Sequence, residues 1–174
     1  MKKILLLNPP GDKIYIRDYY RSKVSKSNYY YHLLDLLYLS GRFSNDNFET
    51  HLIDAIADNL SKKETFLAIK DINPDIILSL IASPSYNQDI DFLKKELVKY
   101  KTRPVLIFMH IPPPTDISRG SLSETEWEKL KTTLDRHKEN IKHIFCAHIH
   151  GYHEYSIDGY PVLITAGGGA DMVY

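Results

Sequence analysis

The sequence has little cysteine, no long hydrophobic run and no excess of charge of either sign. Its one cysteine, Cys146, has no partner for an internal disulfide, and it excludes a cysteine-only zinc site or an iron–sulfur cluster held by this chain alone. The apolar run Ile4–Leu7 is too short for a membrane span or a signal-peptide core. The 22 basic and 22 acidic residues cancel, which argues against a nucleic-acid partner bound through phosphates. We therefore expect a cytoplasmic protein with no membrane partner.

The remaining composition is that of a folded globular domain. The chain has 174 residues, of which 43% are hydrophobic and 25% are charged. These proportions are typical of a protein with one buried core, and they argue against bulk disorder. The length fits a single domain, or one domain with a small appendage.

Segments with the pattern of buried strands alternate with segments that have helical periodicity. The expected strands are Lys3–Leu7, Thr50–Asp54, Asp75–Ala82, Pro104–Met109 and Ile141–Cys146, and the expected helices cover 30–43, 62–72, 88–100 and 124–134. Capping boxes begin the second and the fourth helix, at Ser61 and Ser123. This alternation predicts an α/β protein of the three-layer Rossmann- or flavodoxin-like class, with a mostly parallel sheet.

The C-terminal part departs from that alternation. Gly151–Ile157 and Tyr160–Thr165 both have strand character, and only Asp158-Gly159 separates them. Such a pair fits the positive φ angles of a type I′ turn, so we expect an antiparallel hairpin at the end of the sheet. Gly167–Gly169 follows as a flexible corner.

A basic stretch lies near the N-terminus. Residues 1–26 contain seven basic and two acidic residues. Because residues 12–28 show no clear hydrophobic period, we expect a loop there. Two interpretations stay open at this point: a solvated loop, or a segment that contacts a phosphate-bearing ligand.

Histidines gather in the second half of the chain. Six of the eight lie between residues 110 and 153. His148 and His150 are two positions apart after one expected strand, and on an extended segment both rings would lie on one side. His110 ends the neighbouring strand, and imidazole is a good ligand for Mn, Fe, Ni or Zn. Three such ligands favour a divalent metal site, whereas ordinary polar residues at strand ends are the alternative.

Residues 103–174 resemble the C-terminal half of calcineurin-like metallophosphoesterases. The matching stretches are Pro104–Pro113, Cys146–Tyr152, Asp158–Pro161 and Thr165–Ala170. The resemblance implies that His110, His148 and His150 bind metal and that the substrate is a small phosphoester. Ala147 stands where that family usually has glycine.

The first half lacks the other motifs of that family. Strand Lys3–Leu7 runs into Asn8-Pro9-Pro10 and not into Asp-X-His, and no Asn-His pair occurs in the chain. The family's bridging carboxylate and catalytic histidine therefore have no match. Asp54 ends the second expected strand, and its position alone makes it a candidate carboxylate ligand.

Residues 1–100 resemble the N-terminal cobalamin-binding domain of radical SAM enzymes. The matching stretches are Ile4–Gly11, Ile16–Tyr20, Asp35–Arg42, Ile53–Asp58 and Asn73–Ile77. This resemblance implies a Rossmann-like half with cobalamin over the carboxyl ends of its strands. The three-cysteine motif of radical SAM chemistry is excluded by the single cysteine.

The chain thus combines two incomplete α/β families, which is the pattern of a chimera or a fusion. We expect one α/β domain over 1–174, with a seam at 99–103 between the two halves. Three functions are compatible with the residues. They are a metal-dependent phosphoesterase-type hydrolase, whose site is either active or else incomplete or inactive; a non-catalytic cobalamin-binding module; and a folded scaffold without activity.

Overall fold

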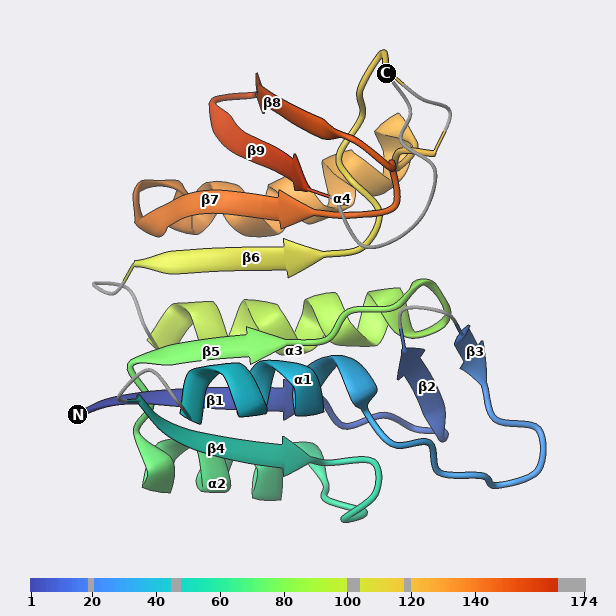
Figure 1. Cartoon of the computed structure of the whole chain (residues 1–174), viewed down its shortest axis with the longest axis vertical. Helices are drawn as coiled ribbons and strands as arrows, with labels where there is room; N and C mark the ends of the chain where they lie inside the picture. Colours follow the sequence, from blue (N-terminus) through green and yellow to red (C-terminus); the bar gives the residue numbers. More distant parts are fainter. Residues whose placement is uncertain (19–20, 45–47, 100–103, 118–119, 166–174) are drawn as a thin grey trace. The chain divides into compact units, whose positions relative to one another are not determined.

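The computed structural model describes residues 1–18, 21–44, 48–99, 104–117 and 120–165 (Figure 1). Contacts divide the chain into two compact units, Met1–Leu93 and Lys94–Tyr174. Most of the predicted seam, from residue 100 to 103, lies outside the described residues. One domain over the whole chain therefore stays a prediction.

The first unit is built on a parallel sheet of three strands. They are β1 (Lys2–Asn8), β4 (Phe48–Asp54) and β5 (Ile76–Ser79), in the order β4-β1-β5. The central strand β1 is buried on both faces, and Leu5 and Leu6 are fully enclosed. A continuous apolar run is what such a position requires. The three strands predicted here are confirmed.

The predicted loop at 12–28 is wrong. β2 (Tyr15–Asp18) pairs antiparallel with β3 (Arg21–Val24) in a separate two-stranded sheet. Tyr15 and Ile16 are buried on this hairpin, and so is the charged Arg17. The sequence does not show the alternation of apolar and polar residues that marks a strand, because one of the buried side chains, Arg17, is charged.

Helices complete the first unit. α1 (Leu34–Ser44) follows β3, and its Leu36 packs with Ile4 and Leu6 of β1 in one core cluster. α2 (Lys62–Ile72), the short helix η1 (Ser83–Ser85) and α3 (Tyr86–Lys99) come next along the chain. Phe66 of α2 stacks on Phe92 of α3, with ring centroids 4.8 Å apart. Figure 1 shows α1 in front of the sheet and α2 behind it.

The second unit has a sheet of four strands. β6 (Val105–Met109), β7 (Ile141–Cys146), β9 (Tyr160–Thr165) and β8 (Tyr152–Ile157) lie in that order. The first three are parallel, whereas β8 and β9 form the predicted antiparallel hairpin. Asp158 and Gly159 have φ angles of 51° and 78°, as a type I′ turn requires.

One helix of the second unit contributes three large apolar side chains to its core. α4 (Glu124–Leu134) is followed by the short helix η2 (Asp135–Asn140). Leu130 and Leu134 of α4 are fully buried. Trp127 meets the buried ring of Tyr160 edge-on, with centroids 5.9 Å apart. The indole N–H of Trp127 donates to Asp158, so the helix also fastens the hairpin turn.

The fold is therefore mixed α/β. A parallel sheet in the first unit and a mixed sheet with a C-terminal antiparallel hairpin in the second confirm the α/β part of the prediction. In the part of the chain that the structure describes, no helix has the length and apolar character to cross a membrane.

Candidate functional site

His110 and His148 lie together at the carboxyl ends of two adjacent parallel strands. His110 follows β6 directly, and His148 follows β7 by two residues. His148 Nδ1 and His110 Nε2 are 3.0 Å apart, so one ring nitrogen donates a proton to the other. The rings meet edge-on, with centroids 4.8 Å apart. Two histidines predicted as metal ligands are thus brought together across 38 positions of sequence.

The turn after β7 sets the position of this pair. The Ala147 N–H donates to the His110 carbonyl (3.1 Å), and the Ile149 N–H donates to the Ala147 carbonyl (2.7 Å). Ile149 is buried and anchors the segment. The segment is bent and not extended, so spacing alone does not place His148 and His150 on one side.

His148 itself has a left-handed backbone, with φ of 65°. This conformation costs a non-glycine residue roughly 1 kcal/mol or more. Such outliers persist where the surrounding structure holds them, and they cluster at binding sites. The left-handed backbone of His148 therefore marks this corner of the second unit as a candidate binding site independently of the sequence motif.

The surroundings of His110 favour its neutral form. Burial lowers the pKa of His110, and the nearby charges of His148 and His150 lower it further. A neutral imidazole offers a lone pair, which is the form that binds a metal ion.

The fourth predicted ligand, Asp54, lies in the first unit. At the end of β4, its Oδ1 accepts hydrogen bonds from Asn8 Nδ2 (2.7 Å) and from the Ala57 N–H (3.1 Å). Among the described residues, no group of three or more His, Cys, Asp or Glu side chains is already arranged to hold a metal ion. His110 and His148 are the two predicted ligands that the structure brings into contact.

A buried ion pair in the first unit was missed by sequence reasoning. Arg17 Nη2 lies 2.8 Å from Asp89 Oδ1, and both side chains are almost completely buried. Arg17 also donates to Asn8 Oδ1 (2.7 Å), and Asp89 accepts from the Ser85 hydroxyl (2.7 Å) and the Ala82 N–H (3.1 Å). Burial raises the pKa of Asp89, and Arg17 opposes that rise.

This pair corrects one sequence interpretation. Arg17 belongs to the basic stretch, yet it is buried, and it is therefore neither solvated nor available to a phosphate. Asp89 lies in the first turn of α3 and is 3% exposed. The sequence carries only a weak signal for this pair. It is a basic residue between Ile16 and Asp18, in a segment whose hydrophobic pattern does not predict strands.

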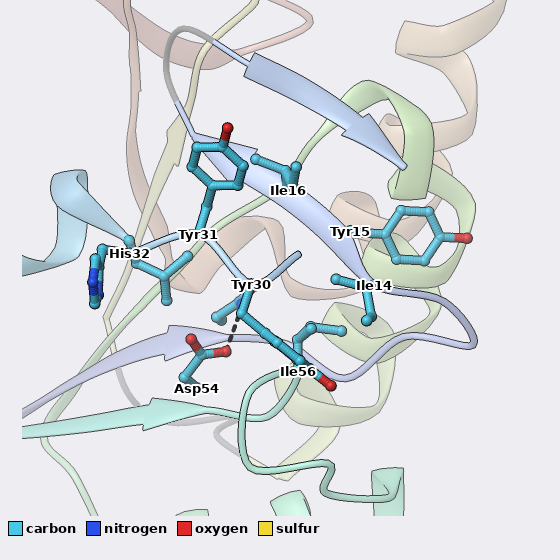
Figure 2. Close-up of a pocket in the computed structure, with 10 residues that line it drawn as sticks. Ile14, Tyr15, Ile16, Tyr30, Tyr31, His32, Asp54 and Ile56 are labelled. Carbon is cyan, nitrogen blue, oxygen red and sulfur yellow. Dashed lines mark hydrogen bonds between the residues drawn. The ribbon is translucent and has the colours of Figure 1, made fainter. Parts of the chain in front are cut away.

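A pocket lies beside this network, at the carboxyl end of the parallel sheet (Figure 2). Its interior is only about 10 Å³, which is room for roughly one water molecule. Its walls include Asn8, Ile16, Tyr30, Tyr31 and Asp54. Figure 2 shows Tyr30 extending toward Ile56 and Tyr31 pointing the other way, beside Ile16.

Cys146 is a small apolar residue of the buried core. It is 3% exposed, and burial raises the pKa of its thiol to about 12. A thiol in that state is neither a nucleophile nor a ready metal ligand at neutral pH. The predicted glycine corner, Gly167–Gly169, lies outside the described residues.

Comparison with models of known protein families and with curated proteins finds no match for this chain. The function is therefore inferred from the residues and their geometry.

Proposed function

We propose that the second unit binds a divalent metal ion, Mn, Fe, Ni or Zn, through His110, His148 and His150, as a phosphoesterase-type hydrolase site does. The observation that supports this most is the 3.0 Å approach of His110 Nε2 to His148 Nδ1. Two nitrogens bound to one tetrahedral zinc ion lie roughly 3.3 Å apart. The two donors therefore need to separate by only a few tenths of an ångström to share an ion.

The donor set fits one ion better than two. Three neutral imidazoles leave the charge of a divalent cation unbalanced, and a second ion would double that charge. A bound ion would polarise a phosphoester oxygen and lower the pKa of a bound water. His110 would supply its lone pair in the neutral state that burial favours. The role of Asp54 as a carboxylate ligand stays a prediction.

Metal content of the purified protein tests this proposal. We expect about one equivalent of zinc or manganese per chain after desalting, and a higher melting temperature with metal than with chelator. His148→Ala and His150→Ala should lose both effects. His32→Ala is the matched control, because it removes an exposed histidine of the first unit and should change neither.

Equal metal content in His148→Ala and the unchanged protein would contradict the proposal. Asp54→Asn tests the carboxylate separately: unchanged metal content would remove Asp54 from the ligand set. If metal binds, hydrolysis of chromogenic phosphomonoesters and phosphodiesters with Mn²⁺ decides between an active enzyme and a binding site without activity.

We also infer that the first unit has a three-layer, Rossmann- or flavodoxin-like arrangement. In support, α1 packs on the side of Ile4 and Leu6, and the aromatic stack of Phe66 on Phe92 joins α2 to α3. Cobalamin binding at the strand ends stays a prediction of the sequence resemblance. Mixing the protein with cobalamin and looking for a co-eluting visible spectrum tests it.

A further inference from the structure

Helix α1 carries an apolar face on its outer side. Its inner side packs on the parallel sheet through Leu36, which is 1% exposed (Figure 1). On the other side Leu34 is 49% exposed, Leu37 is 43% exposed and Tyr38 is 79% exposed. Leu37 and Tyr38 follow Leu34 by three and four positions, so the three side chains are neighbours on the helix surface. A surface helix ordinarily has polar residues there, whereas α1 is apolar on two sides.

Gly41 continues this face by one more turn. It follows Tyr38 by three positions and Leu37 by four. A glycine inside a helix lowers the stability of that helix relative to alanine. A Cβ atom on Gly41 would meet no side chain of the described residues within 4 Å, so packing inside the chain does not require the glycine. A position without a side chain does let a second helix approach closely.

The spacing of the outer face is the same in both directions along the helix. Its four positions, 34, 37, 38 and 41, are separated by three, one and three residues. Two α1 helices that lie antiparallel about an axis between positions 37 and 38 therefore bring Leu34 of one copy onto Gly41 of the other. Leu37 of each copy then meets Tyr38 of the other. A two-fold interface requires this self-complementarity, because both copies use the same patch.

The charges beside the outer face fit the same arrangement. Asp35 lies in the first turn of α1 and Arg42 in the last turn. Because they are seven positions apart, which is close to two turns, they lie on the same flank of the helix. In an antiparallel two-fold pair each flank meets the same flank of the other copy, so Asp35 comes beside Arg42 of the second copy. A parallel pair would instead bring like charges together.

We propose that the outer face of α1 is the interface of a homodimer in which two copies of this helix pack antiparallel. A net charge of zero leaves no long-range repulsion between the copies. The face is smaller than the about 800 Å² that each partner buries in a stable complex, so we expect a Kd in the micromolar range. An unrelated protein would not require the symmetric spacing, and a lipid surface would not require the glycine.

Sedimentation velocity of the full chain, from about 1 µM to about 200 µM and with chelator present, tests the proposal. We expect monomers at the low end of this range and dimers at the high end. Leu37→Glu places like charges close to the two-fold axis and should weaken the dimer at least about tenfold. Leu67→Glu is the matched control, because Leu67 of α2 is 50% exposed and lies outside the face.

Gly41→Leu separates close helix packing from general apolar association. Leucine favours the helical conformation more than glycine does, so the melting temperature of the dilute monomer should rise. The added side chain would strengthen association that depends only on apolar area. In the proposed dimer it collides with Leu34 of the second copy, so the dimer should weaken about tenfold.

An exchange of charges tests the antiparallel orientation. Asp35→Arg and Arg42→Asp should each weaken the homodimer several-fold, because like charges then meet across the interface. In an equimolar mixture of these two variants every such contact joins opposite charges. The mixture should therefore dimerise more strongly than either variant alone.

Several outcomes would overturn the proposal. They are a monomer at every concentration, the same Kd for Leu37→Glu as for the unchanged chain, stronger association of Gly41→Leu, or no gain on mixing the two charge variants. Thermal melts at low concentration show whether each variant remains folded. Because the metal proposal depends on histidines of the second unit, its failure would leave this result intact.

Discussion

At the scale of single residues, Arg17 shows how the fold uses a charge in the interior. Its guanidinium donates to Asp89, Asn8, Ser85 and the Pro9 carbonyl, and its side chain is fully buried. A buried ion pair of this kind contributes little net stability when complete, because desolvation offsets the attraction. Removing only one of the two partners lowers the stability strongly, because the other charge is then buried without a counter-ion.

We predict that Arg17→Met destabilises the protein by about 3–5 kcal/mol, because it leaves the Asp89 carboxylate buried without its cation. Urea unfolding at pH 7 measures this change. The double variant Arg17→Met/Asp89→Leu should recover much of the loss, since neither charge is then buried. Lys13→Met removes an exposed cation from the same stretch and is the control. A loss below about 1 kcal/mol for Arg17→Met would be inconsistent with a tightly held pair.

At the scale of elements, the helix starts are local structures that the sequence alone encodes. Ser61 and Ser123 each accept a hydrogen bond from the N–H of the glutamate three residues on, and that glutamate accepts from the N–H of the serine. The φ angles of Asp158 and Gly159 are another local feature. These predictions were correct because all the atoms involved lie within four residues of one another.

The capping box of α4 should make stability depend on pH. Hydrogen bonds from Ser123 lower the pKa of Glu126. Because the folded pKa lies below the unfolded one, ionised Glu126 stabilises the fold above the unfolded pKa. That stabilisation is lost as pH falls through the folded pKa. Thermal melts should therefore show Glu126→Gln less stable than the unchanged protein at pH 7 and equal to it near pH 3.

Two variants check that interpretation. Ser123→Ala removes the cap and should cost about 1 kcal/mol at pH 7. Glu139→Gln changes an exposed glutamate outside the helix start, and its difference from the unchanged protein should stay near zero at both pH values. A pH-independent effect of Glu126→Gln would mean that the glutamate charge has no role in the cap.

At the scale of the whole molecule, the balance of charge has a consequence for solution behaviour. The 22 basic and 22 acidic residues give a net charge of zero and a pI of about 7.1. Proteins near their isoelectric point repel one another least and associate most readily.

We expect the solubility to be lowest close to pH 7 and to rise on both sides. The midpoint of polyethylene glycol precipitation, measured from pH 5.5 to pH 9, would show this minimum. Lys26→Glu combined with Lys63→Glu changes two exposed cations and should move the minimum to lower pH. If the pH of minimum solubility stays the same in this variant, a feature other than net charge governs the association.

The sequence by itself determined the strand and helix order outside residues 12–28, the two capping boxes, the hairpin turn and the histidine-rich corner. Those features depend on neighbours in sequence or on a period repeated within one element. Tertiary structure decided the rest. Arg17 meets Asp89 across 72 positions, and His110 meets His148 across 38. Hydrophobic periodicity carries no information about which distant polar side chains converge, because their pairing follows from strand order and register.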